Sequence, residues 1–556
     1  MKNQYIMKKL NILLMACIAA LGFTSCVQDL NTQPIDPNVL QTFDQDRIYY
    51  KIYAGIGTSG QVGPDGNGDL DGNEGYSVFY RCIFVHNEFP TDCGWWIWRD
   101  AGVTDLNEMT WTSENEFTEL LYNRMSFNVT TCNHFLDNTE GKSDAKTIRQ
   151  RAEVRFMRCL NYYYLLDFFG IPPFTMTVSA ENPKQFIDLS KDKNNAEKKV
   201  QCRAALYRWV LNELLAAENY LDEATEVYRV NANAARLLLA RLYLNAHVYD
   251  PNFEYITQAN ALDSAAIYAK KVMDNGKYKL TNNYAEMFMG DNDRNNGACE
   301  VIFAIPQDGD YIQSWGATSY LVCMTRAAGM LPWGSTDKWE CFRTSPEMVE
   351  VFLNGKTAGT IKADETKMPA LLGDDRAILC SQACADAAKP DSITYKADFT
   401  GGAKYGEGTF TNCWAMCKWT GCYSTGETRG KHSQFVDTDV PLFRVAEAYM
   451  TYAEALWRKN PSDPVALQTI NDMRATRHAD PLPSLDENTL LDEWLREFYC
   501  EGRRRVDLIR FGQFCGPNST KTWEGHTAGK DAKYILYPIP NKDIVANPNL
   551  AQNEGY

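Results

Sequence analysis

The chain has 556 residues, of which 45% are hydrophobic and 12% aromatic, so it can bury a large core. Asp and Glu outnumber Lys and Arg by 71 to 56, and a net charge of −15 repels phosphate backbones, which argues against nucleic acid as a partner. After the first 26 residues no apolar run reaches the roughly 20 residues that a membrane-spanning helix needs.

The N-terminus has the pattern of a bacterial lipoprotein signal. Three lysines precede the short apolar run LNILLMACIAALG, and LGFTSC then ends at Cys26. The pattern predicts a signal peptide over residues 1–25, acylation of the Cys26 thiol and a mature chain of 26–556 that is held at a membrane by its lipid. The alternative is an ordinary secretory signal with an incidental cysteine.

The cysteine content does not predict a disulfide framework or a metal site. Of 17 cysteines, Cys17 lies in the signal and Cys26 would carry lipid, which leaves an odd number with no CxxC pair. One cluster stands out, but its spacing does not match that of zinc ribbons. Its members are Cys380, Cys384, Cys413, Cys417 and Cys422. We expect mostly reduced, buried cysteines and no metal centre.

Helical periodicity dominates from about residue 114 to 278 and returns near the C-terminus. In SDAKTIRQRAEVRFMRCLNYYYLLDFFG, Ser143 stands at an N-cap position and Gly170 ends the run. Small residues on the facing sides of later helices are typical of tetratricopeptide-like hairpins. We expect pairwise-packed helices near 144–169, 232–248, 262–274, 442–457, 465–476 and 487–500.

Between residues 281 and 436 the composition changes to dense Gly, Asn, Asp, Ser and Thr with short strand-like runs such as EVIFAIP. Long ordered loops are usually functional. The predicted fold is therefore mostly α, with a tetratricopeptide-like helical-hairpin scaffold (40–280 and 437–515) and a loop-rich, short-strand insertion on the ligand side (281–436). All of it belongs to one predicted domain, 26–556.

Motifs for nucleotides and calcium are weak. GIGTSG at residues 55–60 lacks the surrounding βαβ unit of a dinucleotide site. NGDLDG at 67–72 begins like a calcium loop but has Val78 at its twelfth position, so a turn is the better interpretation. In DNDRNN, Asp291 and Asp293 could hold a structural calcium. We otherwise expect no cofactor.

WWIW at residues 95–98 is the most informative local signal. In an extended segment Trp96 and Trp98 share a face about 6.6 Å apart, which is near the repeat of a sugar ring. Polar groups that could bind hydroxyls lie nearby in the sequence. They are Arg81, Asn87, Glu88, Asp92, Arg99 and Asp100. Taken alone, such a stretch is more often a Trp-rich core strand, because large aromatic side chains mostly serve packing.

A glycoside hydrolase would need two carboxylates that face one sugar. Glu88, Asp92, Asp100 and Glu340 lie near the aromatic residues, and nothing in the sequence pairs them. Neither HExxH nor GxSxG is found, and six histidines leave little for acid and base catalysis. We expect a binding protein rather than an enzyme.

Residues 496–514, REFYCEGRRRVDLIRFGQF, combine carboxylates and arginines in a charge-compensated pattern that is structural rather than catalytic. Together with RQRAEVRFMRCLNYYYLLDFFG, PLFRVAEAYMTYAEAL and the terminal YPIPNKDIVANPNLAQNEGY, this stretch closely resembles the SusD/RagB family of outer-membrane nutrient-binding lipoproteins. The resemblance extends over nearly the whole chain. NEFPTDCGWWIW and SYLVCMTRAAGM resemble the starch-binding prototype of that family most.

The resemblance implies a lipid-anchored protein at the cell surface, in the outer membrane, which captures starch-type α-1,4-glucan and passes oligosaccharide to a SusC-like, TonB-dependent porin. By matching motifs, the prototype's tryptophans fall on Trp96 and Trp98 and its arginine on Arg81. A tyrosine of the prototype falls on Trp315, and a further aromatic on Trp339.

One position departs from the prototype. This chain has Ala101 where the prototype has Asn, so Arg99 or Asp100 would have to supply that hydrogen bond. Three alternatives remain: a SusD-like binder of another glycan, a surface glycoside hydrolase, and an adhesin or peptide-binding lipoprotein. If one site unites the aromatic residues, Trp96 and Trp315 should lie within roughly 20 Å of each other.

Overall fold

The computed structural model describes residues 43–60, 63–64, 68–70, 72, 75–383, 393–394 and 410–556. The chain divides into the units Met1–Ile48 and Tyr49–Tyr556, and of the first unit only residues 43–48 are described. The predicted signal peptide and Cys26 lie outside the described residues. The architecture that follows is that of Tyr49–Tyr556.

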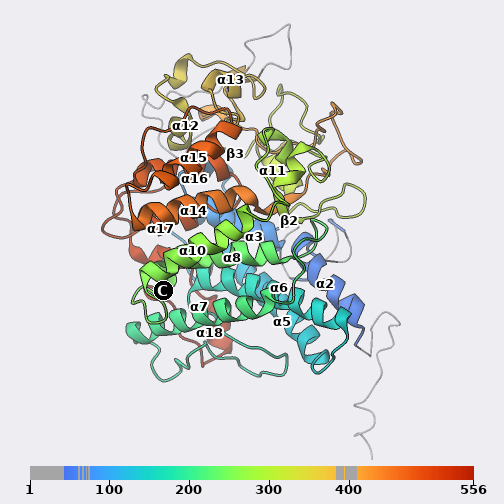
Figure 1. Cartoon of the computed structure of the whole chain (residues 1–556), viewed down its shortest axis with the longest axis vertical. Helices are drawn as coiled ribbons and strands as arrows, with labels where there is room; N and C mark the ends of the chain where they lie inside the picture. Colours follow the sequence, from blue (N-terminus) through green and yellow to red (C-terminus); the bar gives the residue numbers. More distant parts are fainter. Residues whose placement is uncertain are drawn as a thin grey trace, which may run out of the picture. The chain divides into compact units, whose positions relative to one another are not determined.

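Helices dominate the structure, as the sequence predicts (Figure 1). The N-terminal half contains α2 (Gln45–Gly57), α3 (Phe79–Glu88), α4 (Val103–Glu108), α5 (Glu116–Asn138), α6 (Ala145–Phe169), α7 (Ala196–Glu218), α8 (Ala232–Leu244), α9 (Ala246–Tyr249) and α10 (Gln258–Met273). The C-terminal part contains α14 (Val445–Lys459), α15 (Pro464–Thr476), α16 (Glu487–Phe498), α17 (Arg504–Arg510), η6 (Ala532–Ile535) and α18 (Asn541–Ala546).

Successive helices pack side by side, and the pairing joins both ends of the chain. Helix α6 packs against α5 and α7, α8 against α10, and α14 against α10, α8 and α15 (Figure 1). The C-terminal helices therefore complete the scaffold that the N-terminal helices begin. This confirms the prediction of pairwise-packed helices from two distant parts of the sequence.

Helix ends refine the predicted boundaries. The N-cap of α6 is Asp144, whose side chain accepts from Thr147 N at 2.9 Å, rather than the predicted Ser143. Gly170, at φ 68°, closes the same helix as expected. The predicted helix 232–248 is interrupted at Asn245, whose amide donates back to Arg241 O at 2.8 Å and separates α8 from α9.

The segment between the two groups of helices is built from short elements, as predicted. Its helical turns are η1 (Tyr284–Phe288), η2 (Asn296–Glu300), α11 (Thr318–Met324), α12 (Pro346–Leu353), η3 (Ala358–Thr360), α13 (Met368–Leu372) and η5 (Phe410–Asn412). Its strands are β2 (Val301–Ile305), β3 (Phe342–Thr344), β4 (Leu379–Cys380), β5 (Gln382–Ala383), β6 (Ile393–Thr394) and β7 (Ala415–Met416).

Antiparallel pairs attach this segment to the scaffold. Strand β2 pairs with β8 (Val440–Arg444), which leads directly into α14. Strand β1 (Gly94–Trp96) pairs with β3, so that Trp96 lies opposite Phe342. The β2–β8 pair anchors the insertion to the scaffold. The β1–β3 pair brings the WWIW segment against the insertion.

The cysteines are packing residues. All fourteen in the described part of the chain are free, and only Cys299 and Cys422 are not fully buried. Burial raises the pKa of Cys82 and Cys132 to about 12, so these thiols stay protonated at neutral pH. The prediction of reduced, buried cysteines is confirmed for these residues.

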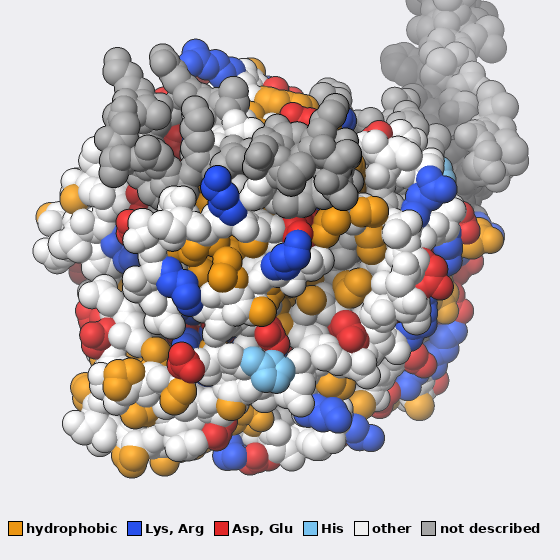
Figure 2. Space-filling model, turned by 90° about the horizontal axis from the view of Figure 1, so that it is seen from above, with side chains coloured by type: hydrophobic (Ala, Val, Ile, Leu, Met, Phe, Trp, Pro, Cys, Tyr) orange, Lys and Arg blue, Asp and Glu red, His pale blue; other side chains and the backbone are white. Residues whose placement is uncertain are grey.

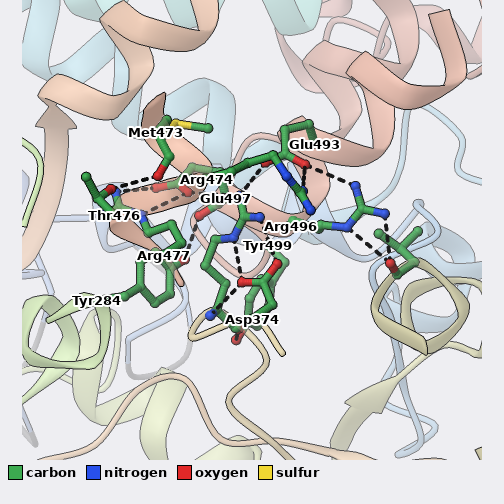
Figure 3. Close-up of polar contacts among 12 residues, drawn as sticks. Tyr284, Asp374, Met473, Arg474, Thr476, Arg477, Glu493, Arg496, Glu497 and Tyr499 are labelled. Carbon is green, nitrogen blue, oxygen red and sulfur yellow. Dashed lines mark hydrogen bonds and ion pairs between the residues drawn. The ribbon is translucent and has the colours of Figure 1, made fainter. Parts of the chain in front are cut away.

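The motif at 496–514 lies in a buried ion network at the junction of insertion and scaffold (Figure 3). Glu497 of α16 accepts from Arg444 at 2.7 Å, from Arg477 at 2.8 Å and from Arg376 at 3.2 Å. Glu300, at the end of η2, accepts from Arg444 at 2.8 Å and from Arg477 at 2.9 Å. Each of these five side chains is almost fully buried.

A third carboxylate extends the network by one turn of α16. Glu493 accepts from Arg376 and Arg474, each at 2.7 Å, and from Arg496 at 3.0 Å (Figure 3). Because removing one partner of a buried ion pair is strongly destabilising, this network fixes how the insertion sits on the scaffold. The expectation that the motif is structural fits this arrangement.

No helix among the described residues is long and apolar enough to cross a membrane. On the face shown in Figure 2, acidic and basic side chains are interspersed and apolar side chains reach the surface between them. Such a mixed surface lacks the single-sign patch that steers charged macromolecules.

Candidate functional site

Six aromatic side chains form a continuous row, the aromatic strip. From one end to the other they are Trp98, Trp96, Tyr320, Trp339, Trp315 and Phe435. Their successive ring centroids are 5.7, 5.9, 5.9, 5.3 and 4.5 Å apart. Three of these steps join Trp96 to Trp315, so the two lie within the 20 Å limit set from the sequence. Segments more than 200 residues apart in sequence thus meet in one row of rings.

Exposure differs along the aromatic strip. The Trp98 side chain is 43% exposed, and Trp315 and Trp339 are half-buried. Trp96 is only 4% exposed, and Tyr320 and Phe435 are also buried. The sequence interpretation placed Trp96 and Trp98 on one exposed face. The structure instead buries Trp96, whose ring packs against Phe89 and Tyr320.

The β1–β3 pair explains why Trp96 turns inward. Strand β1 is buried along its whole length, and beyond it Ile97 N still donates to Cys341 O at 2.7 Å. The indole of Trp96 donates to Asp100 at 3.0 Å. Pairing ends at Ile97, so Trp98 is the first residue of the segment free to face solvent. The two indoles meet edge to face at 79° rather than forming a flat platform.

Trp315 is held by a close approach of two backbone segments that only glycine allows. Gly75 has φ 72°, and a Cβ there would lie 2.7 Å from the Trp315 carbonyl oxygen. A Cβ on Gly316 would lie 2.1 Å from Val78 Cβ. The loop bearing Trp315 therefore packs directly on the turn that precedes α3.

Arg81 lies beneath the aromatic strip. Its guanidinium stacks between the rings of Tyr76 and Tyr320, at 4.1 Å from each centroid, and donates to Trp315 O at 3.1 Å. The side chain is 6% exposed, and its Nε has no hydrogen-bond partner among the described residues. Arg81 thus positions Trp315 through its carbonyl and supports the Tyr320 ring, instead of offering its whole guanidinium to a sugar hydroxyl.

Trp339 is fixed by its backbone. Its amide donates to Cys323 O at 2.8 Å, which ties the 333–339 loop to the end of α11. The same loop is joined to the 429–435 loop, because Thr336 N donates to Ser433 O at 2.7 Å. Two loops that each carry a strip residue are thereby held against each other.

The structure brings together all the aromatic residues that the sequence singles out and adds others. Arg99 is exposed next to Trp98, and Asp100 is engaged by the Trp96 indole. Tyr320 was missed, although it links the two halves of the aromatic strip. Its only signal is its place in SYLVCMTRAAGM, which contributed to the family resemblance; the periodicity of α11 does not distinguish it from a core residue.

Two of the four carboxylates considered for hydrolysis are committed to structure. Asp92 receives a two-pronged contact from Arg504 at 2.6 and 2.8 Å. Glu88 is completely buried and accepts from the backbone amides of Gly502 and Arg503. Burial raises the pKa of Glu88 to about 7. These carboxylates hold the 496–514 motif against α3 and do not face the aromatic strip.

The candidate calcium ligands have other partners. Asp291 accepts from Ser424 Oγ at 2.6 Å and from Asn295 at 3.2 Å, and Asp293 pairs with Arg294 at 2.6 Å. Within the described residues, no group of three or more His, Cys, Asp or Glu side chains could hold a metal ion.

Three partly exposed indoles, backed by buried rings, can stack on the apolar faces of ring-shaped molecules. The polar rim is small and carries both signs, with Arg99 and Asp100 at one end and Asp337, which accepts from Gln434 at 3.1 Å, at the other. This combination suits neutral molecules that have flat apolar faces and hydroxyl edges. The aromatic strip is therefore a candidate site for such molecules, with rings that are tilted rather than coplanar.

Comparison with known proteins agrees with this geometry. The model of the SusD family matches residues 299–556. The starch-binding protein SusD of Bacteroides thetaiotaomicron is 38% identical over 590 aligned residues, which cover 100% of both chains.

Solved structures with lower sequence identity share the fold. A laminarin-binding SusD-like protein superposes with a TM-score of 0.64 at 16% identity, covering 92% of this chain and 99% of its own. A structure solved with a xylogluco-oligosaccharide gives a TM-score of 0.63 at 18% identity, covering 90% of this chain and 97% of its own.

Proposed function

Because this chain belongs to the SusD family, we propose that it is a non-catalytic glycan-binding protein of the cell surface whose preferred ligand is starch-type α-1,4-glucan. The observation that carries the proposal is the aromatic strip, in which Trp98, Trp315 and Trp339 present indole faces backed by buried rings. The relative at 38% identity is named for starch binding, which supports the choice of ligand.

The shape of the strip also supports an α-glucan. Its rings are tilted against one another by 79°, 21°, 58° and 47° between Trp98 and Trp315, so they do not form one plane. A ligand that is already curved loses less conformational entropy when it binds such a surface than a straight, flexible chain does. Helical α-1,4 chains and cyclodextrins are curved in this way, whereas β-glucans are straighter.

Calorimetric titration with a panel of glycans tests the proposal. Maltoheptaose and a cyclodextrin should bind more tightly than a β-glucan, dextran or pullulan. A reducing-sugar assay on the same samples should detect no turnover. Sustained release of reducing ends would show an enzyme, and absence of binding to any α-glucan would overturn the choice of ligand.

A second candidate is a SusD-like binder of a different glycan. Two structures with this fold are titled for laminarin and for a xylogluco-oligosaccharide. The family resemblance also places Asn in the starch-binding prototype where this chain has Ala101. Laminarin and xyloglucan oligosaccharides therefore belong in the same panel. Preference for either one over maltoheptaose would favour this alternative.

The proposal includes a membrane anchor at Cys26 and delivery of the glycan to a SusC-like, TonB-dependent porin. The anchor rests on the lipoprotein-signal pattern that ends at Cys26, and the porin rests on the family resemblance. Cys26 itself lies outside the described residues. Replacing Cys26 with Ala should move the protein from the membrane fraction to the soluble one. Co-purification from solubilised outer membranes tests the porin, and recovery without any porin would contradict that partner.

A further inference from the structure

A cavity of about 880 Å³ shares no lining residue with the aromatic strip. We call it the tyrosine groove. Its lining comes from α2, the first turn of α6, the segment around Tyr228 and the loop 306–313. The volume is within the range of ordinary ligand sites, roughly 300–1,000 Å³. The most prominent lining side chains are Tyr50, Tyr53, Tyr228, Tyr311, Ile312 and Gln313.

Two tyrosine rings of this groove are largely open to solvent, although the Tyr50 ring also meets Tyr49 edge to face at 5.4 Å. Tyr311 is 88% exposed and Tyr50 is 66% exposed. Tyr311 stands at the tip of a tight turn, where Asp308 accepts from the amides of Asp310 and Tyr311 at 2.9 and 3.0 Å. Lys431 forms an ion pair with the same Asp308. The Tyr311 backbone is therefore preorganised, while its ring is free for a ligand.

Both arginines of the groove are engaged by carboxylates. Glu153 is buried and accepts from Tyr53 at 2.5 Å and from Tyr49 and Arg229. Arg149 pairs with Asp222 at 2.8 Å. A lining whose arginines are engaged by carboxylates gives an anion little to bind, whereas exposed phenol rings and their hydroxyls suit a neutral, hydroxyl-rich ligand.

The groove adjoins the aromatic strip through the chain itself. Gln313 lines the groove and Trp315 belongs to the strip, so two peptide units, at most about 7 Å, separate their Cα atoms. One extended ligand can therefore touch both. A second contact on the same molecule acts at high effective concentration and raises affinity without requiring strong binding alone.

We propose that the tyrosine groove is a second subsite for a neutral oligosaccharide, which receives the continuation of a glycan chain held by the aromatic strip. This inference rests on the proposed function. It assigns Tyr50 and Tyr311 as stacking residues. The groove would then make affinity depend on the length of the ligand. A short oligosaccharide occupies the strip alone, and a long one occupies both.

The test compares maltotriose with soluble amylose by calorimetry on wild type and on Tyr50→Ala/Tyr311→Ala. The double variant should bind amylose about three- to tenfold more weakly and maltotriose as wild type does. Because both side chains are exposed, its unfolding midpoint should be unchanged. Tyr220→Ala/Tyr255→Ala removes two exposed tyrosines outside the groove and is the matched control.

The outcomes separate this inference from the proposed function. If wild type binds amylose and the groove variant binds it equally well, the groove is not a subsite and the strip remains. If wild type binds neither glucan, the proposed ligand is wrong and the groove proposal falls with it. If the groove variant loses the same affinity for maltotriose as for amylose, the inference is also overturned, because the groove would then not distinguish long ligands from short ones.

Discussion

The buried ion network and the aromatic strip differ in which side chains they expose to water. In the network, Glu497 is surrounded by three arginines and fully removed from water. In the strip, Trp98 is 43% exposed although it is among the largest apolar side chains. The first region places charge where charge is costly, and the second places apolar surface where water is.

The difference teaches which region determines stability and which determines binding. Every carboxylate of the network is compensated, so loss of one member leaves buried charge behind. The exposed rings of the strip contribute little to folding, because they are not removed from water until a ligand covers them. Stability and affinity should therefore respond to different substitutions.

Acid should affect the buried carboxylate–arginine pairs most strongly. These include Glu493 of the network and two pairs outside it, Glu447 with Arg241 and Glu454 with Arg510. Burial raises the pKa of Glu447, Glu454 and Glu493, but neighbouring arginines outweigh it and lower each pKa from 4.5 to about 2. A depressed folded-state pKa contributes stability that is present above pH 4.5 and lost as pH falls toward 2. Each carboxylate contributes roughly 3 kcal/mol in this window.

Urea unfolding measured between pH 7 and pH 2 checks this expectation. The free energy of unfolding should fall steeply below about pH 4.5. A flat profile down to pH 2 would show that the three carboxylates are not held ionised by their arginines. The indole rings of the strip do not titrate, so they contribute nothing to this curve.

Glu497→Gln should be the most damaging single substitution in the network. The amide keeps the size of the side chain but leaves Arg376, Arg444 and Arg477 without one of their compensating charges. We expect a loss of about 3–5 kcal/mol in the free energy of unfolding, measured by urea titration.

Lys270→Ala is the matched control. It breaks an exposed pair with Asp274, the C-cap residue of α10 four residues away, and should cost no more than about 0.5 kcal/mol. If Glu497→Gln is as stable as this control, the network is not what holds the insertion to the scaffold. Glycan affinity of the folded protein should be the same in both variants.

The sequence predicted the scaffold well because helical periodicity is local. The spans of α6, α10, α14, α15 and α16 agree with the expected ones to within a few residues. The cap of α6 was displaced by one residue, since Ser143 and Asp144 are both good caps and only the structure chooses between them. The break at Asn245 depends on a side-chain contact with the backbone that periodicity does not reveal.

The site was predicted less completely. Motif resemblance found Trp96, Trp98, Trp315 and Trp339, but alternation along a strand could not show that Trp96 is covered by Tyr320. That contact joins residues more than 200 positions apart. Exposure depends on long-range packing. The motif resemblance therefore identified rings that lie near one another, but it did not show which of them face solvent.

Trp98→Ala should separate affinity from stability. Removing this exposed ring should weaken maltoheptaose binding about tenfold and leave the unfolding midpoint unchanged. Trp96→Ala should weaken binding too, but it also removes a buried ring and should cost about 3–5 kcal/mol of stability. Calorimetry and urea unfolding of both variants give the comparison; equal stability losses would contradict it.

Trp315→Tyr should have the smallest effect. The family resemblance places a tyrosine at this position in the starch-binding prototype, so the role requires an aromatic face rather than an indole. Trp315 packs against Trp339 at 5.3 Å and Phe435 at 4.5 Å, and a tyrosine ring can keep both contacts. We expect less than about a threefold change in affinity for maltoheptaose, under 1 kcal/mol.

Trp315→Leu, which keeps the apolar character but removes the ring, is the control and should weaken binding about tenfold. If Tyr and Leu behave alike, Trp315 supports the loop and the glycan stacks only on Trp98 and Trp339.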